Sequence, residues 1–152
     1  MNSTASVELL PTEESLPRSS HSLALINDVL YILGGEVRPR EPASPFLHVL
    51  NLRGSISWNS ELILDGSLKP LETDLSPPLR VGAASVVVDG KIYLWGGRGG
   101  KAMIPLDEGG KFWVFDPETS SWAQTPDPNG DNPEPRSYHC LAAIHVPPNL
   151  RN

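Results

Sequence analysis

Two short apolar phrases, each closed by a pair of glycines, constrain this chain more than any other feature. VLYILGG covers residues 29–35, and KIYLWGG repeats the pattern at residues 91–97. A strand with one wet face alternates apolar and polar residues, whereas a strand that is apolar along its length is buried on both faces. The two phrases therefore predict short strands with a cover above and below, and their recurrence predicts a repeated structural unit.

Other landmarks recur in register with these phrases. Arg18 and Arg80 anchor the two units, and a third anchor, Arg136, opens PRSYHCLAAI, which echoes PRSSHSLALI at residues 17–26. The anchors are 62 and 56 residues apart. The landmarks that follow the first two anchors at matching or nearly matching distances are Tyr31 and Tyr93, Gly34-Gly35 and Gly96-Gly97, and Trp58 and Trp122.

Each unit is predicted to form four short strands. The expected ranges are 19–26, 29–34, 46–52 and 57–63 in the first unit, and 82–88, 91–96, 111–116 and 121–125 in the second. Asn27-Asp28 and Asp89-Gly90 separate the first two strands, and these residue types tolerate the positive φ of a tight hairpin turn. The proline-rich stretches 65–78 and 126–135 are expected to link the units.

An all-β architecture follows, in which sheets stack face to face around an axis. The alternative is a two-sheet sandwich, but each of its sheets has a solvated face and its strands alternate more clearly. The repeat resembles the kelch repeat, whose unit of about 50 residues forms one blade of a β-propeller. The resemblance implies an N-terminal segment at 1–16 with a possible outer strand at 6–11, blades at 17–77 and 78–134, and the first strand of a third blade at 135–152.

The same resemblance implies structural roles for the landmark residues. The glycine pairs end the second strand, where backbones crowd and a residue without Cβ is suited. The tyrosines and tryptophans are expected to pack between blades. A propeller closes with about four to eight blades, and Pro147-Pro148 stand where a strand of the third unit is expected. We therefore expect a partial, truncated propeller whose open blade face allows self-association.

A narrower resemblance links the chain to the nitrile-specifier and thiocyanate-forming kelch proteins. GGE at 34–36, RVGA at 80–83 and GGR at 96–98 carry it. It implies a non-redox enzyme that acts on glucosinolate aglucones with ferrous iron, and arginines near the axis that bind the sulfate-bearing substrate. Arg18, Arg80 and Arg136 are the matching candidates. The Glu-x-x-x-Asp-x-x-x-His run that holds iron in that family does not occur in the sequence, so no cofactor is expected unless further blades supply the site.

The arginines also have a purely structural interpretation. Repeated guanidinium groups can bind an anion through forked hydrogen bonds, but they can equally pair with carboxylates or carbonyls between blades, which we favour. His21 and His139 share a repeat position, and Ala83 at the equivalent position favours backbone hydrogen bonding over a metal site. Cys140 is expected to be a small core residue rather than a nucleophile.

Composition limits the partners. The net charge is −6, and the twelve basic residues are scattered, which argues against nucleic-acid and anionic-membrane surfaces. No apolar run approaches the length of a membrane span, no secretory signal is visible, and one cysteine fits a reducing, cytoplasmic location.

Three functions compete at this stage. The first is a protein-binding module that presents the loops 36–45 and 98–110, because loops on rigid β scaffolds commonly carry binding. The second is the specifier-type enzyme. The third is a copper oxidase like galactose oxidase, which also uses a kelch propeller, although the sequence shows no matching Tyr/His/Cys copper site.

Overall fold

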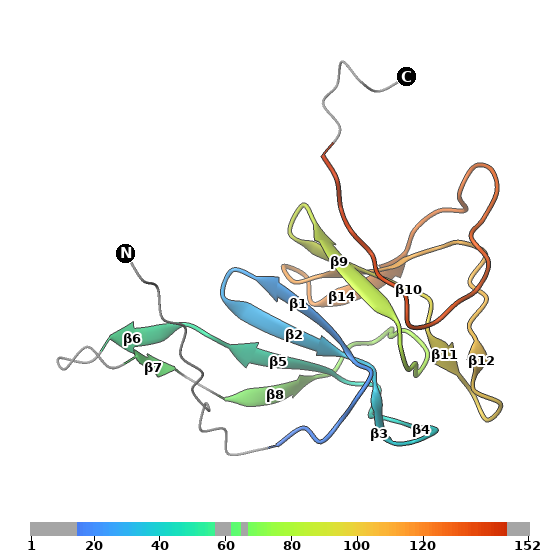
Figure 1. Ribbon diagram of the computed structural model, residues 1–152. Coiled ribbons are helices and arrows are strands. Elements are labelled where there is room, and N and C mark those ends of the chain that lie inside the picture. The colour runs from blue at the N-terminus through green and yellow to red at the C-terminus, as the bar shows by residue number, and fades with distance from the viewer. Residues whose placement is uncertain (1–14, 57–61, 65–66, 146–152) are drawn as a thin grey trace, which may run out of the picture.

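A computed structural model describes residues 15–56, 62–64 and 67–145, and they form two four-stranded antiparallel sheets that pack against each other (Figure 1). Described residues contain no helix. Blade 1 has the order β1-β2-β5-β8, and blade 2 has the order β14-β13-β10-β9. The bounds are β1 (Ser22–Ile26), β2 (Val29–Leu33), β5 (Leu47–Asn51), β8 (Leu68–Leu71), β9 (Ala84–Val88), β10 (Lys91–Trp95), β13 (Trp113–Asp116) and β14 (Ser121–Gln124).

Both blades begin with the predicted tight hairpin. Ile26 pairs with Val29, and Val88 pairs with Lys91, so each turn has two central residues. Asn27 and Asp28 have φ of 50° and 64°, and Asp89 and Gly90 have 49° and 73°. These left-handed conformations match the right-handed twist of the flanking strands, which explains why the sequence places Asn, Asp and Gly there.

The core lies between the two sheets. Tyr31 of β2 contacts Phe115 of β13 with ring centroids 5.7 Å apart, and Phe115 contacts Trp122 of β14 at 5.1 Å. Phe115 and Ile92 are fully buried. The other buried members of this cluster are Ala24, Leu33, Leu47, Leu94 and Trp113. Apolar burial between blades is therefore the main stabilising term, as it is for stacked sheets in general.

The glycine pairs lie where one unit meets the next. The Gly35 amide donates to the Arg80 carbonyl at 3.0 Å, and the Gly97 amide donates to the Arg136 carbonyl at 2.9 Å. A Cβ on Gly34 or Gly96 would lie 2.7 Å from the same carbonyl oxygens, and all four glycines have positive φ. Glycine is therefore required at these positions for two reasons: the backbone conformation is left-handed, and the next unit approaches too closely for a side chain.

A second set of backbone bonds repeats the same step. The Gly82 amide donates to the Ser20 carbonyl at 2.9 Å, and the Tyr138 amide donates to the Gly82 carbonyl at 2.7 Å. These three residues share one repeat position, and all have positive φ. The segment 135–145 therefore docks on blade 2 in the way that blade 2 docks on blade 1, although its described residues form no strand.

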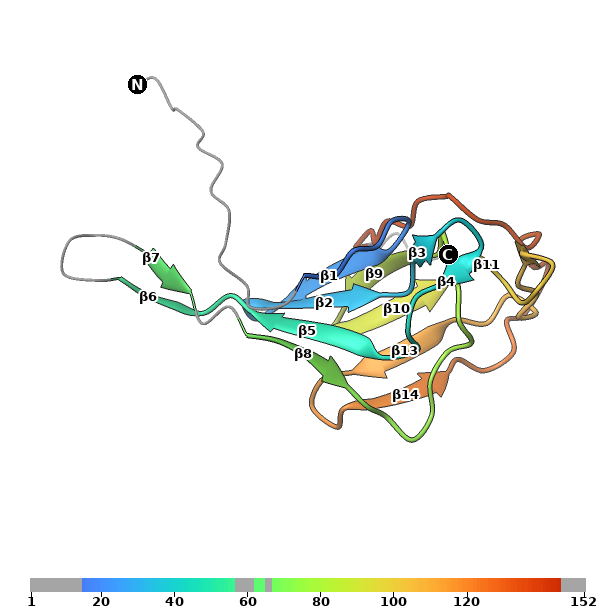
Figure 2. The same ribbon diagram turned by 90° about the horizontal axis from the view of Figure 1, so that it is seen from below.

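The fourth strand of blade 1 differs from the prediction of 57–63. β8 fills that place, inside the expected linker 65–78, and residues 54–64 instead contribute the hairpin of β6 (Gly54–Ile56) and β7 (Leu62–Leu64), which extends away from the sheet (Figure 2). The register places Leu68 opposite Leu50, as Trp122 lies opposite Phe115. Leu68 is therefore the counterpart of Trp122; Trp58 and the expected strand at 6–11 lie outside the described residues.

Burial of β2, in blade 1, is one-sided. Tyr31 and Leu33 face blade 2 and are buried, whereas Leu30 and Ile32 are half-buried. Leu23 and Leu25 of β1 are about half exposed. The expected second cover is thus not supplied by the described residues, because only one face of blade 1 meets a neighbouring sheet there. Tyr93 correspondingly points away from blade 1 and contacts Phe112, with ring centroids 6.2 Å apart.

Replacing Gly34 with alanine should destabilise the contact between blades. The new Cβ would press on the Arg80 carbonyl, and the residue would hold a left-handed conformation that costs L-residues about 1–2 kcal/mol. We expect a loss of about 2–4 kcal/mol in the free energy of unfolding measured with urea. Gly90→Ala is the matched control, because Gly90 also has positive φ but nothing lies within 4 Å of its Cβ position; equal losses for both variants would contradict the crowding.

Candidate functional site

Two small hairpins mark one end of the molecule. β3 (Glu36–Arg38) pairs with β4 (Glu41–Pro42), and β11 (Arg98–Gly99) pairs with β12 (Ile104–Pro105). Each follows the glycine pair of its blade, so the repeat carries both hairpins to the same end, as both views show (Figures 1 and 2). The predicted loops 36–45 and 98–110 are therefore hydrogen-bonded ribbons rather than irregular loops. We call this region the hairpin end.

Apolar side chains are exposed on both hairpins. Val37 is 52% exposed and Ile104 is 62% exposed. Arg38, Arg40 and Lys101 place exposed positive groups on the same two ribbons. An apolar contact surface with arginine at its edge is typical of protein-binding surfaces.

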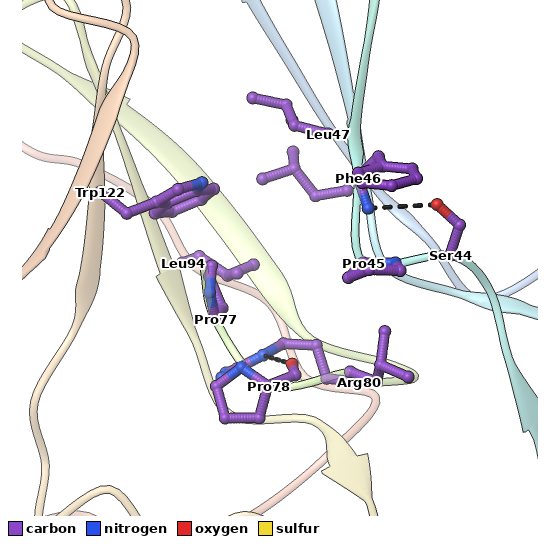
Figure 3. A pocket seen from close by; sticks show the side chains of 12 residues that line it. Ser44, Pro45, Phe46, Leu47, Pro77, Pro78, Arg80, Leu94 and Trp122 are labelled. Atoms are coloured by element: carbon purple, nitrogen blue, oxygen red, sulfur yellow. Dashed lines mark hydrogen bonds between the residues drawn. The ribbon is translucent and has the colours of Figure 1, made fainter. Parts of the chain in front are cut away.

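A shallow apolar groove runs between the blades next to these hairpins (Figure 3). Ser44, Pro45 and Phe46 lie on one side, Trp122 lies on the opposite side, and Pro77 and Pro78 lie beside them. The Phe46 amide donates to Ser44 Oγ at 3.1 Å, which holds this edge in place. Phe46 and Leu79 remain partly exposed beside the groove, so the apolar surface continues from the hairpins into the blade interface.

The buried side chain of Arg80 stabilises the part of blade 2 that carries the β11–β12 hairpin. Its side chain is 2% exposed and pairs with Glu108, with Nη2 and Oε1 2.7 Å apart and Nη1 and Oε2 3.0 Å apart. Arg80 also donates to the carbonyls of Gly96 and Pro78. Glu108 Oε1 accepts a further hydrogen bond from Trp113 Nε1 at 2.6 Å. All three guanidinium nitrogens of Arg80 are therefore engaged by a carboxylate and carbonyls. These partners lie within the second unit, whereas we expected them between blades.

The other two anchor arginines have different surroundings. Arg18 Nη1 donates to the Gly34 carbonyl at 3.1 Å, which is the counterpart of the bond from Arg80 to Gly96. Its Nη2 lies 3.4 Å from His48 Nδ1, its Nε has no partner among the described residues, and burial lowers the pKa of Arg18. Arg136 is exposed, and its Nε donates to the Glu134 carbonyl. Anion binding by these arginines stays a prediction. The structure does not bring three free guanidinium groups together around one anion site.

The histidines of the repeat do not converge. His21 is exposed, whereas His139 packs its ring against Trp95, with centroids 5.0 Å apart. Both ring nitrogens of His139 are buried without a hydrogen-bond partner among the described residues. The prediction that His139 forms a hydrogen bond with the backbone is therefore wrong. Burial, and secondly the charge of Arg136, lower the pKa of His139 below its ordinary value.

Cys140 is exposed, which contradicts the expected core position. It lies in the docked segment 135–145, directly after Tyr138 and His139, whose contacts with blade 2 are described above. Over the described ranges, no three His, Cys, Asp or Glu side chains are grouped so that they could hold a metal ion. These residues therefore offer no fit for the ferrous iron that the narrower resemblance implies.

The described part of the chain also has no helix of the length and apolarity that a membrane crossing requires.

Glu108 is the residue that sequence reasoning missed. It pairs with Arg80 across 28 residues and comes from a glycine-rich segment without a counterpart in the first unit. The recurring arginine was the only signal, since a buried guanidinium requires a partner, but the sequence did not say which carboxylate supplies it.

Removing the Glu108 carboxylate should destabilise blade 2. Glu108→Ala leaves a buried arginine without its counter-charge and Trp113 Nε1 without its acceptor, so we expect a loss of about 3–5 kcal/mol in the free energy of unfolding. Glu41→Ala is the matched control, because Glu41 forms an exposed ion pair with Arg38 at 3.6 Å and such pairs contribute at most about 1 kcal/mol. Urea unfolding measures both. A loss for Glu108→Ala no larger than the control would contradict the assignment.

Acidification should release the segment 135–145. His139 has a lowered pKa in the folded chain, so its contribution to docking is present above the ordinary value of 6.5 and is lost as pH falls through the folded value. We expect the protection of the Tyr138 amide against hydrogen exchange, corrected for intrinsic rates, to fall as pH decreases below about 6.5. His139→Phe should remove this decrease while keeping the contact with Trp95, and His21→Phe should keep it. The same decrease in all three proteins would contradict the role of His139.

Comparison with known proteins places these features in a family. The family model of the KLHDC2/KLHL20/DRC7 kelch-repeats domain matches residues 2–146. N-(sulfonatooxy)prop-2-enimidothioate sulfolyase from Thlaspi arvense is 30% identical over 128 residues, which are 84% of this chain and 33% of that protein. Tip elongation aberrant protein 3 from Schizosaccharomyces pombe is 28% identical over an alignment of 137 residues, and the match covers 76% of this chain and 12% of that protein.

The chain thus spans a third or less of the length of these relatives. The family match extends over both blades and the docked segment, and the recurring arginines, glycine pairs and hairpins give the same assignment from the structure. This chain belongs to the kelch-repeat family, and its two described sheets are blades of a partial kelch propeller.

Proposed function

We propose that this chain is a protein-binding module that uses the hairpin end as its contact surface. Kelch-repeat domains support protein interaction, and the finer assignment to this end rests on one observation. Two hairpins from separate blades expose Val37 and Ile104 beside a groove lined by Pro45, Phe46 and Pro78. Solvent-exposed apolar side chains that gather at one place, with arginine and lysine around them, favour a protein partner.

The hairpin end is rigid enough to bind without a large entropic cost. The β3–β4 ribbon is tied to its blade because the Ala43 amide donates to the Gly35 carbonyl at 2.8 Å. The β11–β12 ribbon is tied in the same way by Leu106, whose amide donates to the Gly97 carbonyl at 2.9 Å, and by the buried pair of Arg80 and Glu108. A preorganised surface loses less conformational freedom when it binds, and this supports the choice of the two ribbons.

The outer face of β1 is a second apolar surface, and we assign it to self-association. Leu23 and Leu25 are exposed there, on the face turned away from blade 2. Their counterparts in the repeat, Ser85 and Val87, lie on the blade-2 face that packs against blade 1. In the repeat, the equivalent face of blade 2 packs against a neighbouring blade, so we expect this face of blade 1 to pack against a blade of another copy of this chain.

A cytoplasmic location stays a prediction.

Catalysis of the sulfolyase kind is the second candidate. The 30% identity to the Thlaspi arvense protein favours it, whereas the engagement of Arg80 by Glu108 and the lack of a metal-ligand group in the described ranges do not. Incubating the purified chain with ferrous iron and glucosinolate aglucones decides between the candidates: nitrile or thiocyanate products would support the enzyme.

Paired surface substitutions test the binding module. We expect Val37→Ser/Ile104→Ser to abolish capture of the partner from an extract, because it removes the apolar contacts of both hairpins without touching the core. Leu23→Ser/Leu25→Ser is the matched control, with two exposed apolar residues removed on the other surface; it should keep the partner and reduce self-association in light scattering. Partner loss only with the Leu23/Leu25 variant would move the site to β1, and capture by both variants would contradict the proposal.

A further inference from the structure

A large cleft lies between the blades at the end opposite to the hairpin end. Its volume is about 510 Å³, within the range of about 300–1,000 Å³ that is typical of small-molecule sites. Val29 begins β2, Asn51 ends β5 and Pro117 follows β13, so the cleft is bordered by the ends of strands that point away from the hairpins. It shares no lining residue with the groove of Figure 3, and its use would be independent of protein binding at the hairpin end.

The floor of the cleft is aromatic and apolar. Tyr31 and Phe115 line it from the two blades, and Val49 lies beside Tyr31 in the register of β2 and β5. The Tyr31 hydroxyl has no hydrogen-bond partner in the described part of the chain, and burial raises the pKa of Tyr31, so this group remains a protonated donor. Polar groups at the border, such as Asn51 and Ser120, accompany this floor, and a site that combines apolar surface with polar groups can orient a small ligand.

Lys69 is the unusual member of this cleft. It completes the cross-strand row Tyr31–Val49–Lys69 on the face of blade 1 that turns toward blade 2. The equivalent row of blade 2 ends in Ala123, so the repeat does not require a lysine here. Among the described residues, no Asp or Glu lines the cleft and Lys69 forms no ion pair. Within the described part of the chain, an ammonium group without a counter-charge therefore stands beside the aromatic floor of the cleft.

We propose that this cleft binds a small carboxylate with an apolar, aromatic body. The aromatic body lies against Tyr31, Val49 and Leu71, and the carboxylate pairs with the Lys69 ammonium at the edge. Each part of the ligand matches one part of the site: apolar surface is removed from water at the floor, and an ammonium forms a charge-assisted hydrogen bond with a carboxylate. Pro70 and Pro117 at the border restrict the backbone and favour a cleft that exists before binding.

Hydrocinnamate is a suitable probe, and its neutral analogue hydrocinnamamide is the matched control ligand. Titration of the isotope-labelled chain, followed by amide chemical shifts, should give saturable changes at Asn51 and Ser120, with a dissociation constant in the millimolar range that is expected for so small a ligand. We expect the amide to bind about fivefold more weakly, as does the acid in high salt, because an exposed ion pair contributes about this factor.

Substitutions of the exposed Lys69 separate binding from folding. Lys69→Gln should weaken hydrocinnamate about fivefold and make its affinity equal to that of the amide. Lys69→Glu should reverse the preference, so that phenylpropylamine binds better than hydrocinnamate, which a merely unfolded variant would not show. Lys101→Gln, at the hairpin end, should bind as the wild type does. Equal affinities for acid and amide in the wild type, or the lack of saturable changes at Asn51 and Ser120, would overturn the proposal.

Discussion

The architecture depends on the approach of one backbone carbonyl to a pair of glycines. The Arg80 carbonyl accepts a hydrogen bond from the Gly35 amide, and the Arg136 carbonyl accepts one from the Gly97 amide. Both carbonyls occupy space that a side chain would fill if Gly34 or Gly96 were any other residue. Because the same step recurs from unit to unit, it sets the distance and angle between blades. The rings of Tyr31 and Phe115 then meet in the core, with centroids 5.7 Å apart.

The same arginine serves two neighbouring units. Its backbone carbonyl binds the preceding blade at Gly35, and its side chain binds the glycine carbonyl of its own blade, Gly96, and the carboxylate of Glu108. Arg18 makes the corresponding side-chain bond to Gly34, and no carboxylate among the described residues pairs with it. The recurring arginine is therefore explained by the construction of the blades, and the two proposed binding surfaces, the hairpin end and the cleft beside Lys69, depend on other side chains.

Residues that repeat were predictable from the sequence, and residues that break the repeat were not. The hairpin turns at Asn27-Asp28 and Asp89-Gly90, the strands before the glycine pairs and the packing of Tyr31 and Trp122 all follow from local turn chemistry and from two units in register. The fourth strand of blade 1 was misplaced because the paired strands β6 and β7 are inserted before it, which moves the strand to Leu68–Leu71. Glu108 and Lys69 could not be found because each occurs in one unit only, and their neighbours are set by the tertiary structure.

Hydrogen exchange of the glycine amides tests the central claim most directly. If the Arg80 carbonyl docks on the glycine pair, the Gly35 amide exchanges as slowly as amides inside β2, although Gly35 lies outside any strand. The amide of Gly100, a turn residue in which a Cβ would meet open space, serves as the fast reference. Exchange of Gly35 at the rate of Gly100 would contradict the account, because the two blades would then not be joined by the contact on which their packing depends.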